Sequence, residues 1–398
     1  MAAIVRQPIK SAAPSWPAGS PASPAVRMGD LLFTSGQIAV DGDFQPLYPG
    51  DVAAQTRHAF DNIRTLVDAA GGSMNDVLEM MVFVRDPRDL PSIYDVARDY
   101  FDGDYPAWTV IGSIGLQHPE TLVSLRAIAH LGSESKQCIT PDTLRWMRQH
   151  PMSAGCRKGD YLFVSGQVAA DTDGLLIGSG DHAAQARYCC NRIREITEAA
   201  GGTLDDVIDV ISFHQDARGM GPAVDVWTHE FMEGLPFDEV AALTAIGTHA
   251  LPQLGMLGSY RAIADFSGGK RVAKTPPSIW WKVEAIAGGT KKEHGHLIGL
   301  AGQVASDGDG LITTPGDTAA QARYAFNRIA EVLDAFGATM DNVAEVISFH
   351  KDPRAWEIVM DVGREYFPVD AGPAWTPVGA TGLFQEGYLH EIYTVAVV

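Results

Sequence analysis

The most constraining feature of the sequence is a unit that occurs three times. Three short blocks return in the same order, displaced first by 130 and then by 136 residues (51 to 181 to 317, for example). The blocks are 32–39, 162–169 and 298–305; 51–57, 181–187 and 317–323; and 83–88, 213–218 and 349–354. Equal offsets across separate blocks indicate repeated structural units. We therefore expect three domains, at 1–133, 138–270 and 275–398, separated by polar joints.

The charge balance argues against nucleic acid as a partner. The chain carries 30 Lys and Arg against 49 Asp and Glu, a formal net charge of −19. Such a field repels phosphate backbones, and no local basic cluster offsets it. With 46% apolar and 20% charged residues among 398, the bulk of the chain is expected to fold into packed domains.

Membrane insertion and disulfide bonding are also not indicated. No apolar run reaches the roughly 18 residues needed to span a bilayer, and the first residues lack the pattern of an export signal. The four cysteines form no C-x-x-C pair. We expect a cytoplasmic protein without a membrane partner.

One unit has the pattern of a mixed α+β fold. Strands are predicted over 31–40 and 77–84, the latter an apolar run with one glutamate. A helix is predicted from the N-cap Asp51 to the glycines at 71–72, and a second over 90–101. Two strands, 107–114 and 121–131, complete the order β(β)-α-β-α-β-β. Two helices cover one sheet face, so the other face needs cover from neighbouring units.

Four of these motifs together resemble the Rid proteins, the YjgF-like reactive intermediate deaminases also described as L-PSP endoribonucleases. The motifs are Ser-Gly-Gln at 35–37, the block 51–57, Phe-x-x-Asp at 83–86 and Arg-Ala-Ile-Ala at 126–129. The resemblance covers all three units. It implies a bacterial chorismate mutase-like fold, homotrimers with clefts between subunits, and hydrolysis of enamines and imines without metal or cofactor. The chain is accordingly expected to form an intramolecular pseudo-trimer.

Two functional positions of that family differ in this sequence. The deaminase branch has an arginine after the Pro-Ala step of the fifth strand, which holds the substrate carboxylate, and a glutamate on the last strand, which orients water. The matching positions hold Trp108, Leu243 and Trp375, and Arg126, Arg261 and Tyr393, respectively. The resemblance therefore predicts the fold of this chain, whereas the family's reaction cannot be transferred directly, because these two functional positions differ.

Recurrent arginines are candidates for binding a substrate carboxylate, because guanidinium offers two parallel charge-assisted hydrogen bonds. For Arg126 and Arg261, on the final strands, both a substrate role and a salt bridge between units are open. A second set follows the third strand, and an aspartate two residues before each member favours a structural role. This set is Arg88, Arg218 and Arg354.

Aromatic side chains are candidates for contacting a flat conjugated substrate. Trp108 and Trp375 could stack on it, with core packing as the alternative. Tyr393 completes the expected binding set.

Histidines and glutamates are candidates for moving protons. His214 and His350 stand at equivalent places at the end of the third strand, and either could protonate a leaving amine. A histidine bonded to neighbouring backbone is the structural alternative. Water activation is assigned to three further candidates, none of which the repeat singles out. They are Glu120, Glu386 and Glu391.

The Ser-Gly-Gln loops offer donors for a bound oxyanion. Ser35 and Ser165 lack the surroundings of a nucleophile, and Ala301 replaces them in the third unit. Their hydroxyls, with the amides of Gly36 and Gly166, are expected to hydrogen-bond an oxyanion. No metal-ligand spacing is present.

The expected function is a cofactor-free hydrolase or deaminase in clefts between units. Its substrate would carry a C–N bond, as an imine, an enamine or a related group, in a small anionic metabolite that could be conjugated or aromatic-derived. Two alternatives stay open: a non-catalytic protein that binds a small acid, and a hydrolase of an enol ether or cyclic amide. Because each chain completes its own ring, we expect a monomer or a dimer of pseudo-trimers.

Overall fold

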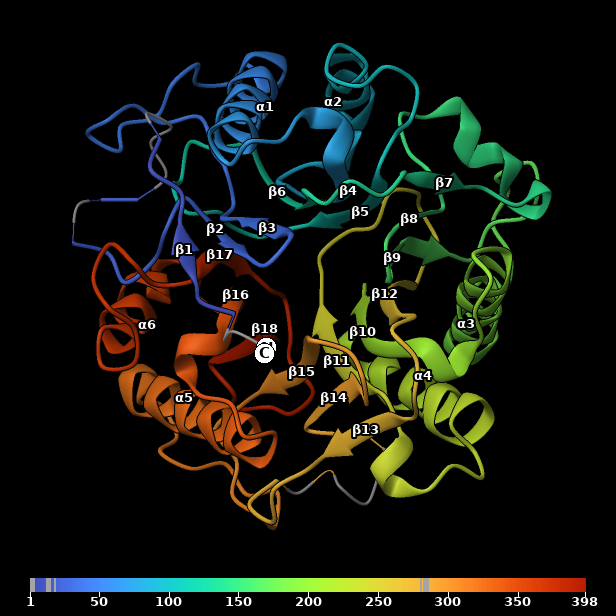
Figure 1. The fold of residues 1–398 in the computed structure, drawn as a ribbon, viewed down its shortest axis with the longest axis vertical. Coiled ribbons are helices and arrows are strands. Elements are labelled where there is room, and N and C mark those ends of the chain that lie inside the picture. Colours follow the sequence, from blue (N-terminus) through green and yellow to red (C-terminus); the bar gives the residue numbers. More distant parts are fainter. Residues whose placement is uncertain (1–3, 12–15, 18, 280, 282–285) are drawn as a thin grey trace.

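Three units form a closed ring in the computed structural model, which describes residues 4–11, 16–17, 19–279, 281 and 286–398. Each unit contains one six-stranded sheet and two main helices. The helices lie on the outside of the ring and the sheets face its middle (Figure 1). The α+β class and the three-unit ring predicted from the sequence are confirmed.

The first unit shows the arrangement that all three share. Its elements are β1 (Gln7–Pro8), β2 (Ala25–Met28), β3 (Leu31–Thr34), α1 (Val52–Ala69), β4 (Val77–Val84), α2 (Leu90–Ala97), β5 (Ala107–Gly112) and β6 (Val123–His130). The strand order is β1-β2-β3-β6-β4-β5. The β4–β5 pair is parallel and the other pairs are antiparallel.

The second and third units repeat this order. The second contains β7 (Gln137–Ile139), β8 (Gly155–Lys158), β9 (Tyr161–Val168), α3 (His182–Ala199), β10 (Val207–His214), α4 (Met220–Val226), β11 (Ala242–Gly247) and β12 (Gly258–Asp265). The third contains β13 (Arg271–Lys274), β14 (Gly289–Lys292), β15 (Leu297–Gln303), α5 (Thr318–Ala335), β16 (Val343–His350), α6 (Trp356–Gly363), β17 (Ala374–Gly379) and β18 (His390–Val397). None of the helices in the described ranges is long and apolar enough to cross a bilayer.

The local sequence signals explain where the elements begin. The side chain of Asp51 accepts a hydrogen bond from the Ala54 amide, 2.9 Å away, and so caps α1. Asp181 and Asp317 cap α3 and α5 in the same way. Every residue of β4 is buried, as its apolar run predicts. The edge strands β1, β7 and β13 have only two to four residues, too few for a periodic pattern to reveal them.

Equivalent backbone contacts close the ring at all three junctions. The Ser153 amide of the second unit donates to the Pro106 carbonyl of the first at 3.0 Å, and the Ser23 amide of the first donates to Pro373 of the third at 3.0 Å. The Ala287 amide of the third unit donates to Ala241 of the second at 3.4 Å. Each pair begins a parallel bridge that joins one unit to the next. The first unit therefore packs on the third as well as on the second.

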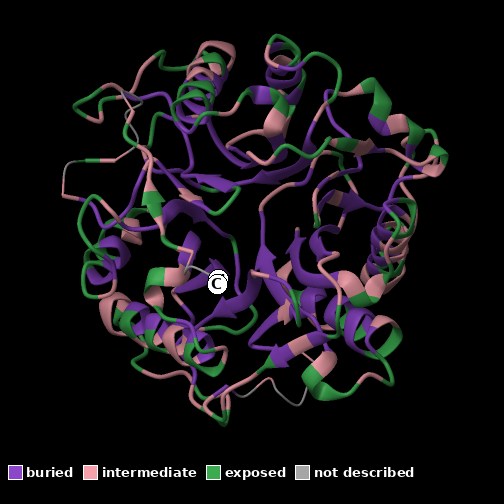
Figure 2. Ribbon diagram, in the orientation of Figure 1, coloured by how far each residue is buried: buried purple, intermediate pink, exposed green. Residues whose placement is uncertain are grey.

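Apolar side chains fill two layers. One lies between each sheet and its helices, and the other lies at the centre, where the inner faces of the three sheets meet (Figure 2). Phe83, Phe213 and Phe349 stand at equivalent positions in this central layer, and the rings of the last two lie 6.0 Å apart. The inner sheet faces are thus covered by one another, as the two-helix unit requires.

Candidate active site

Clefts lie at two of the junctions between units, and two positions near the junctions recur in all three units. On the last strand of each unit, Ser124, Ser259 and Glu391 pair in the same register with the three equivalent phenylalanines of the neighbouring strand. A tryptophan from the N-terminal segment of each unit also lies at a junction: Trp146 and Trp281 line the cavities described below. The glutamate distinguishes the third unit from the other two.

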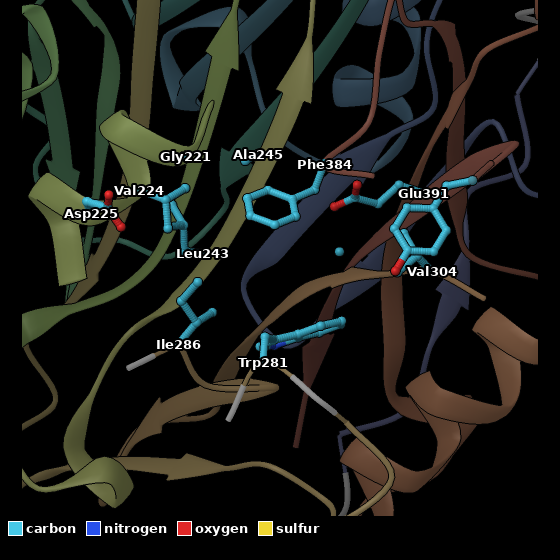
Figure 3. Close-up of a pocket in the computed structure, with 12 residues that line it drawn as sticks. Gly221, Val224, Asp225, Leu243, Ala245, Trp281, Ile286, Val304, Phe384 and Glu391 are labelled. Atoms are coloured by element: carbon cyan, nitrogen blue, oxygen red, sulfur yellow. The ribbon is translucent and has the colours of Figure 1, made fainter. Parts of the chain in front are cut away.

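The cleft between the second and third units is small and largely apolar. Its cavity volume is about 90 Å³. Aliphatic side chains from both units and aromatic side chains from the third unit surround it, and Figure 3 shows the Glu391 carboxyl group pointing into the space between Phe384 and Trp281. The second unit contributes Gly221, Val224, Asp225, Leu243 and Ala245; the third contributes Trp281, Ile286, Gly302, Val304, Phe384, Tyr388 and Glu391.

The Glu391 side chain is enclosed without a compensating charge. The residue is 5% exposed, and no hydrogen bond or ion pair of its carboxyl group occurs among the described residues. Burial alone raises its pKa to about 8. Gly302 provides the room, because a Cβ atom there would lie 2.1 Å from Glu391 Oε1. At neutral pH the carboxyl group is therefore mainly protonated.

A protonated carboxyl group in an apolar cleft can act first as an acid and then as a base. It can give its proton to a substrate atom that gains electron density, and the resulting carboxylate can take a proton from water. A pKa close to the working pH suits both directions. Neither of the other two units has a carboxyl group at this position, since Ser124 and Ser259 take its place.

The cleft between the first and second units is larger but lacks this carboxyl group. Its cavity volume is about 780 Å³. Trp108 takes the place that Leu243 has in the smaller cleft, and Ser259 takes that of Glu391. Arg88 and Arg98 lie at its wall. This cleft is the larger of the two, whereas the buried, protonated carboxyl group lies in the smaller one.

The family of the chain follows from its match to a family model. Residues 13–131, 145–264 and 289–398, one stretch in each unit, match the model described as Endoribonuclease L-PSP. The chain belongs to the L-PSP family. Its three copies of the L-PSP domain correspond to the three units of the ring.

Two shorter proteins and one longer structure are similar to the chain. A protein of Acinetobacter baylyi named 3-aminoacrylate deaminase RutC is 34% identical over 112 residues, which cover 28% of this chain and 88% of that protein. The structure of E. coli TdcF with bound serine is 30% identical, covers 32% of this chain and 99% of TdcF, and has a TM-score of 0.29. A chorismatase structure covers 82% of this chain and 94% of its own, at 14% identity and a TM-score of 0.54, a likeness of fold.

Within this L-PSP ring, Arg126 and Arg261 lie in a buried ionic network at the centre. Both side chains are fully buried. Arg126 forms ion pairs with Glu79 of its own unit and Glu345 of the third. Arg261 pairs with Glu79, 2.6 Å from Nε to Oε1, and with Asp209, 2.7 Å from Nη1 to Oδ2. Of the two roles left open for these arginines, the structure shows the salt bridge between units, since both guanidinium groups contact carboxylates of the protein.

Tyr393 belongs to the same network. Its hydroxyl group donates to Asp209 Oδ2 at 2.7 Å and accepts from Arg261 Nη1 at 3.0 Å. Burial raises the pKa of Asp209 to about 6 and also raises that of Glu345, whereas the two arginines lower the pKa of Glu79 against the effect of its burial. Tyr393 is fully buried and is not among the residues that line the Glu391 cleft.

The serine hydroxyls of the Ser-Gly-Gln loops bind backbone rather than a cleft ligand. Ser35 Oγ donates to the Ser23 carbonyl at 2.6 Å and accepts from the Trp375 amide of the third unit at 2.8 Å. Ser165 Oγ makes the same two contacts, to the Ser153 carbonyl and from the Trp108 amide. Both hydroxyls therefore fasten the start of a neighbouring strand, and an oxyanion would have to displace these bonds.

The glycines after these serines are packed against the neighbouring unit. The Gly166 amide donates to Thr109 Oγ1 at 3.0 Å, so it is already used. A Cβ atom at Gly36 would lie 2.7 Å from both Ser124 Oγ and Thr376 Cγ2. These contacts favour a close approach of two units over the expected oxyanion contact.

The two histidines are buried beside serines. His214 Nε2 lies 2.9 Å from Ser212 Oγ, and His350 Nε2 lies 2.8 Å from Ser348 Oγ. Burial lowers the pKa of His214 to about 3 and that of His350 well below its ordinary value. Both are neutral at physiological pH, which does not suit the expected role of an acid that protonates an amine.

The remaining candidates are distributed between surface and core. Arg88, Arg218 and Arg354 are about nine-tenths exposed, and each pairs with the aspartate two residues before it. Glu120 and Glu386 are exposed on loops. Neither glutamate lines the cleft of Glu391.

The two tryptophans differ in their surroundings. Trp375 is fully buried in the helix–sheet layer, where it packs against Phe326 and Phe367 and its Nε1 donates to Ser348 Oγ at 2.9 Å. Trp108 is also buried, but it lines the cleft between the first and second units. Of these two tryptophans, only Trp108 lines a described cleft.

A tryptophan recurs at Trp16, Trp146 and Trp281, outside the three repeated sequence blocks. Trp16 donates from Nε1 to Ser35 Oγ at 3.0 Å and lies 5.9 Å from the Trp356 ring, at the junction of the first and third units. The three residues are separated by 130 and 135 positions, close to the offsets of the other blocks. A search for recurrent single aromatic residues would have found them.

Proposed function

We propose that the protein hydrolyses the C–N bond of a small imine or enamine in the cleft between its second and third units, with Glu391 as the catalytic acid and base. The observation that carries this proposal is the position of a buried, uncompensated carboxyl group in an apolar cleft. Membership of the L-PSP family and the similarity to a protein named as a deaminase support this class of reaction.

The reaction can be written with one side chain that transfers protons. Glu391 gives its proton to the β-carbon of an enamine, which becomes an iminium ion paired with the new carboxylate. The carboxylate then takes a proton from water while the water oxygen bonds to the iminium carbon. In the last step the amine nitrogen takes this proton back, the C–N bond breaks, and the hydroxyl proton returns to Glu391. The products are a carbonyl compound and ammonia.

The apolar cleft stabilises the pair of opposite charges that forms during this reaction. The iminium ion forms beside the carboxylate in an apolar cavity, where the attraction between opposite charges is stronger than in water. An imine carbon is already electrophilic, so correct placement of one water molecule and one proton donor lowers the barrier substantially. No metal-binding group of His, Cys, Asp or Glu side chains occurs in the part of the chain that the structure describes.

The size and lining of the cleft narrow the substrate. A cavity of about 90 Å³ is smaller than the ~150 Å³ cavity that accepts a benzene ring. It can enclose the reacting end of a small metabolite, while a longer part would extend towards solvent. No lysine or arginine is among the described lining residues, so the reacting end is uncharged before proton transfer. Any anionic group of the substrate must lie outside this cavity.

A screen for ammonia release tests the proposed reaction. Enamines and imines would be generated in the assay from small amino acids, and aminated muconate-type acids would be included, because the lining is apolar and aromatic. We expect ammonia above a heat-inactivated control with at least one short-chain substrate. Absence of ammonia from the whole panel would refute the deaminase proposal. Binding without turnover, seen as thermal stabilisation, would instead favour the small-acid-binding alternative.

A further inference from the structure

Two cysteines face each other on neighbouring edge strands of the second unit. Cys138 on β7 and Cys156 on β8 are direct partners in the antiparallel register. Their sulfur atoms lie 3.4 Å apart, and both are free thiols. Because the strand pairing brings them together, the absence of a sequence motif such as C-x-x-C conceals this pair.

The surroundings of the two thiols are unequal. Cys138 is half-buried and adjoins the exposed Gln137, whereas Cys156 is fully buried. A hydrogen bond from Cys156 lowers the pKa of Cys138 to about 7, and Lys136 adds to this effect against partial burial and Asp104. Burial raises the pKa of Cys156. One thiol is thus partly ionised and reachable from solvent, and the second lies behind it.

We propose that Cys138 and Cys156 form a peroxide-reactive dithiol, in which Cys138 reacts with a hydroperoxide and Cys156 completes a disulfide. The Cys138 thiolate attacks the terminal oxygen of the hydroperoxide, which forms the S–O bond of a sulfenic acid and releases hydroxide or an alkoxide. Cys156 sulfur then attacks Cys138 sulfur; the S–S bond forms, the S–O bond breaks, and water leaves with the Cys156 proton. Sulfur is oxidised by two electrons and the peroxide is reduced.

The reaction would alter a junction between units. Both thiols lie 3.3 Å from the carbonyl oxygen of Tyr105 in the first unit and can donate to it. The single Cys156 proton can go to Cys138 or to this oxygen, and a disulfide removes both thiol protons and leaves the oxygen without a thiol donor. Tyr105 immediately precedes Pro106, whose carbonyl oxygen accepts the hydrogen bond from the Ser153 amide. Pro106 leads directly into β5, the strand that contains Trp108. Oxidation of the dithiol would therefore change contacts next to the strand that lines the larger cleft. This inference does not depend on the reaction proposed for the Glu391 cleft.

Peptide mapping of the intact chain tests this inference. The native protein is treated with dilute hydrogen peroxide, its remaining thiols are blocked with N-ethylmaleimide after unfolding, and it is digested with trypsin without reductant. Cleavage places Cys138 in peptide 137–145 and Cys156 in peptide 149–157. We expect these two peptides joined, with a mass lower by two hydrogens than their sum, and separated again by dithiothreitol. The buried Cys189 and Cys190, in peptide 188–192, are the internal control and should be recovered blocked.

Two variants assign the order of attack. In Cys156→Ser, Cys138 should stop at a sulfenic acid that dimedone captures; in Cys138→Ser, Cys156 should be recovered as a thiol. The proposal is overturned if the joined peptide is absent from the treated native protein, whether Cys138 is recovered unmodified or as a sulfinic acid. It is also overturned if Cys156 is oxidised equally well without Cys138. The wild-type result decides the question even where Cys156→Ser does not fold.

Discussion

Arg261 of the second unit makes a two-point contact with Glu79 of the first, with Nε 2.6 Å from Oε1 and Nη2 2.9 Å from Oε2. The same guanidinium group also reaches Tyr393 of the third unit. One fully buried side chain therefore contacts all three units. The ionic network at the centre thus holds the three units together.

Removal of Glu79 should destabilise the whole ring. Glu79→Ala leaves two buried guanidinium groups without one of their carboxylates, and breaking a buried ion pair from one side costs about 3–5 kcal/mol. Urea unfolding followed by tryptophan fluorescence measures the change. Arg88→Ala, which removes an exposed pair, is the matched control and should leave the unfolding midpoint unchanged. Equal effects of the two changes would contradict the role of the central network.

Glu391→Gln should stabilise the protein at alkaline pH. The folded carboxyl group titrates near pH 8 and an unfolded one near 4.5, so between these values only the folded chain holds the proton. Raising the pH through this window therefore weakens folding of the wild type, and the glutamine variant escapes this loss. Each unit of pKa corresponds to about 1.4 kcal/mol, so the gain is a few kcal/mol. Unfolding midpoints from pH 4 to pH 9 measure it; a constant difference between the two proteins would disprove the shift.

His214→Gln should reduce sensitivity to acid. The folded imidazole has a pKa lowered to about 3 and an unfolded one titrates near 6.5. Below pH 6.5 the unfolded chain binds a proton that the folded chain does not, so stability is lost as the pH falls towards 3. The variant lacks this contribution and should show a shallower decline of melting temperature from pH 7 to pH 4. Parallel curves for variant and wild type would show that the pKa of His214 is not lowered in the folded protein.

Because each chain closes its own ring of three units, we do not expect three chains to assemble into a trimer. Size-exclusion chromatography with light scattering should give the mass of one chain or of two. A mass of three chains would be incompatible with a ring in which every L-PSP unit already has two neighbours within the same polypeptide.

The repeat and the helix caps made the fold predictable from sequence. Asp51 caps a helix and 77–84 forms a buried strand because each depends on local residues alone. A salt bridge between units was open for Arg126 from the sequence, but its partners were not predictable, since Glu79 and Glu345 come from two units and meet only in the closed ring. The burial that neutralises His214 and protonates Glu391 depends on packing in the same way. Of the three candidate glutamates, Glu391 lies in a cleft, and Glu120 and Glu386 are exposed on loops. The serines at the equivalent positions are identified by strand register.

The most direct measurement of the central claim is the rate of ammonia release by Glu391→Gln, compared with Ser259→Ala at the equivalent place in the larger cleft. Loss of a general acid and base typically lowers the rate by about 10²–10⁴-fold. With the best substrate from the screen at pH 7, we predict a loss of at least about 100-fold for Glu391→Gln and an unchanged rate for Ser259→Ala. A folded Glu391→Gln protein that retains the wild-type rate would contradict the account.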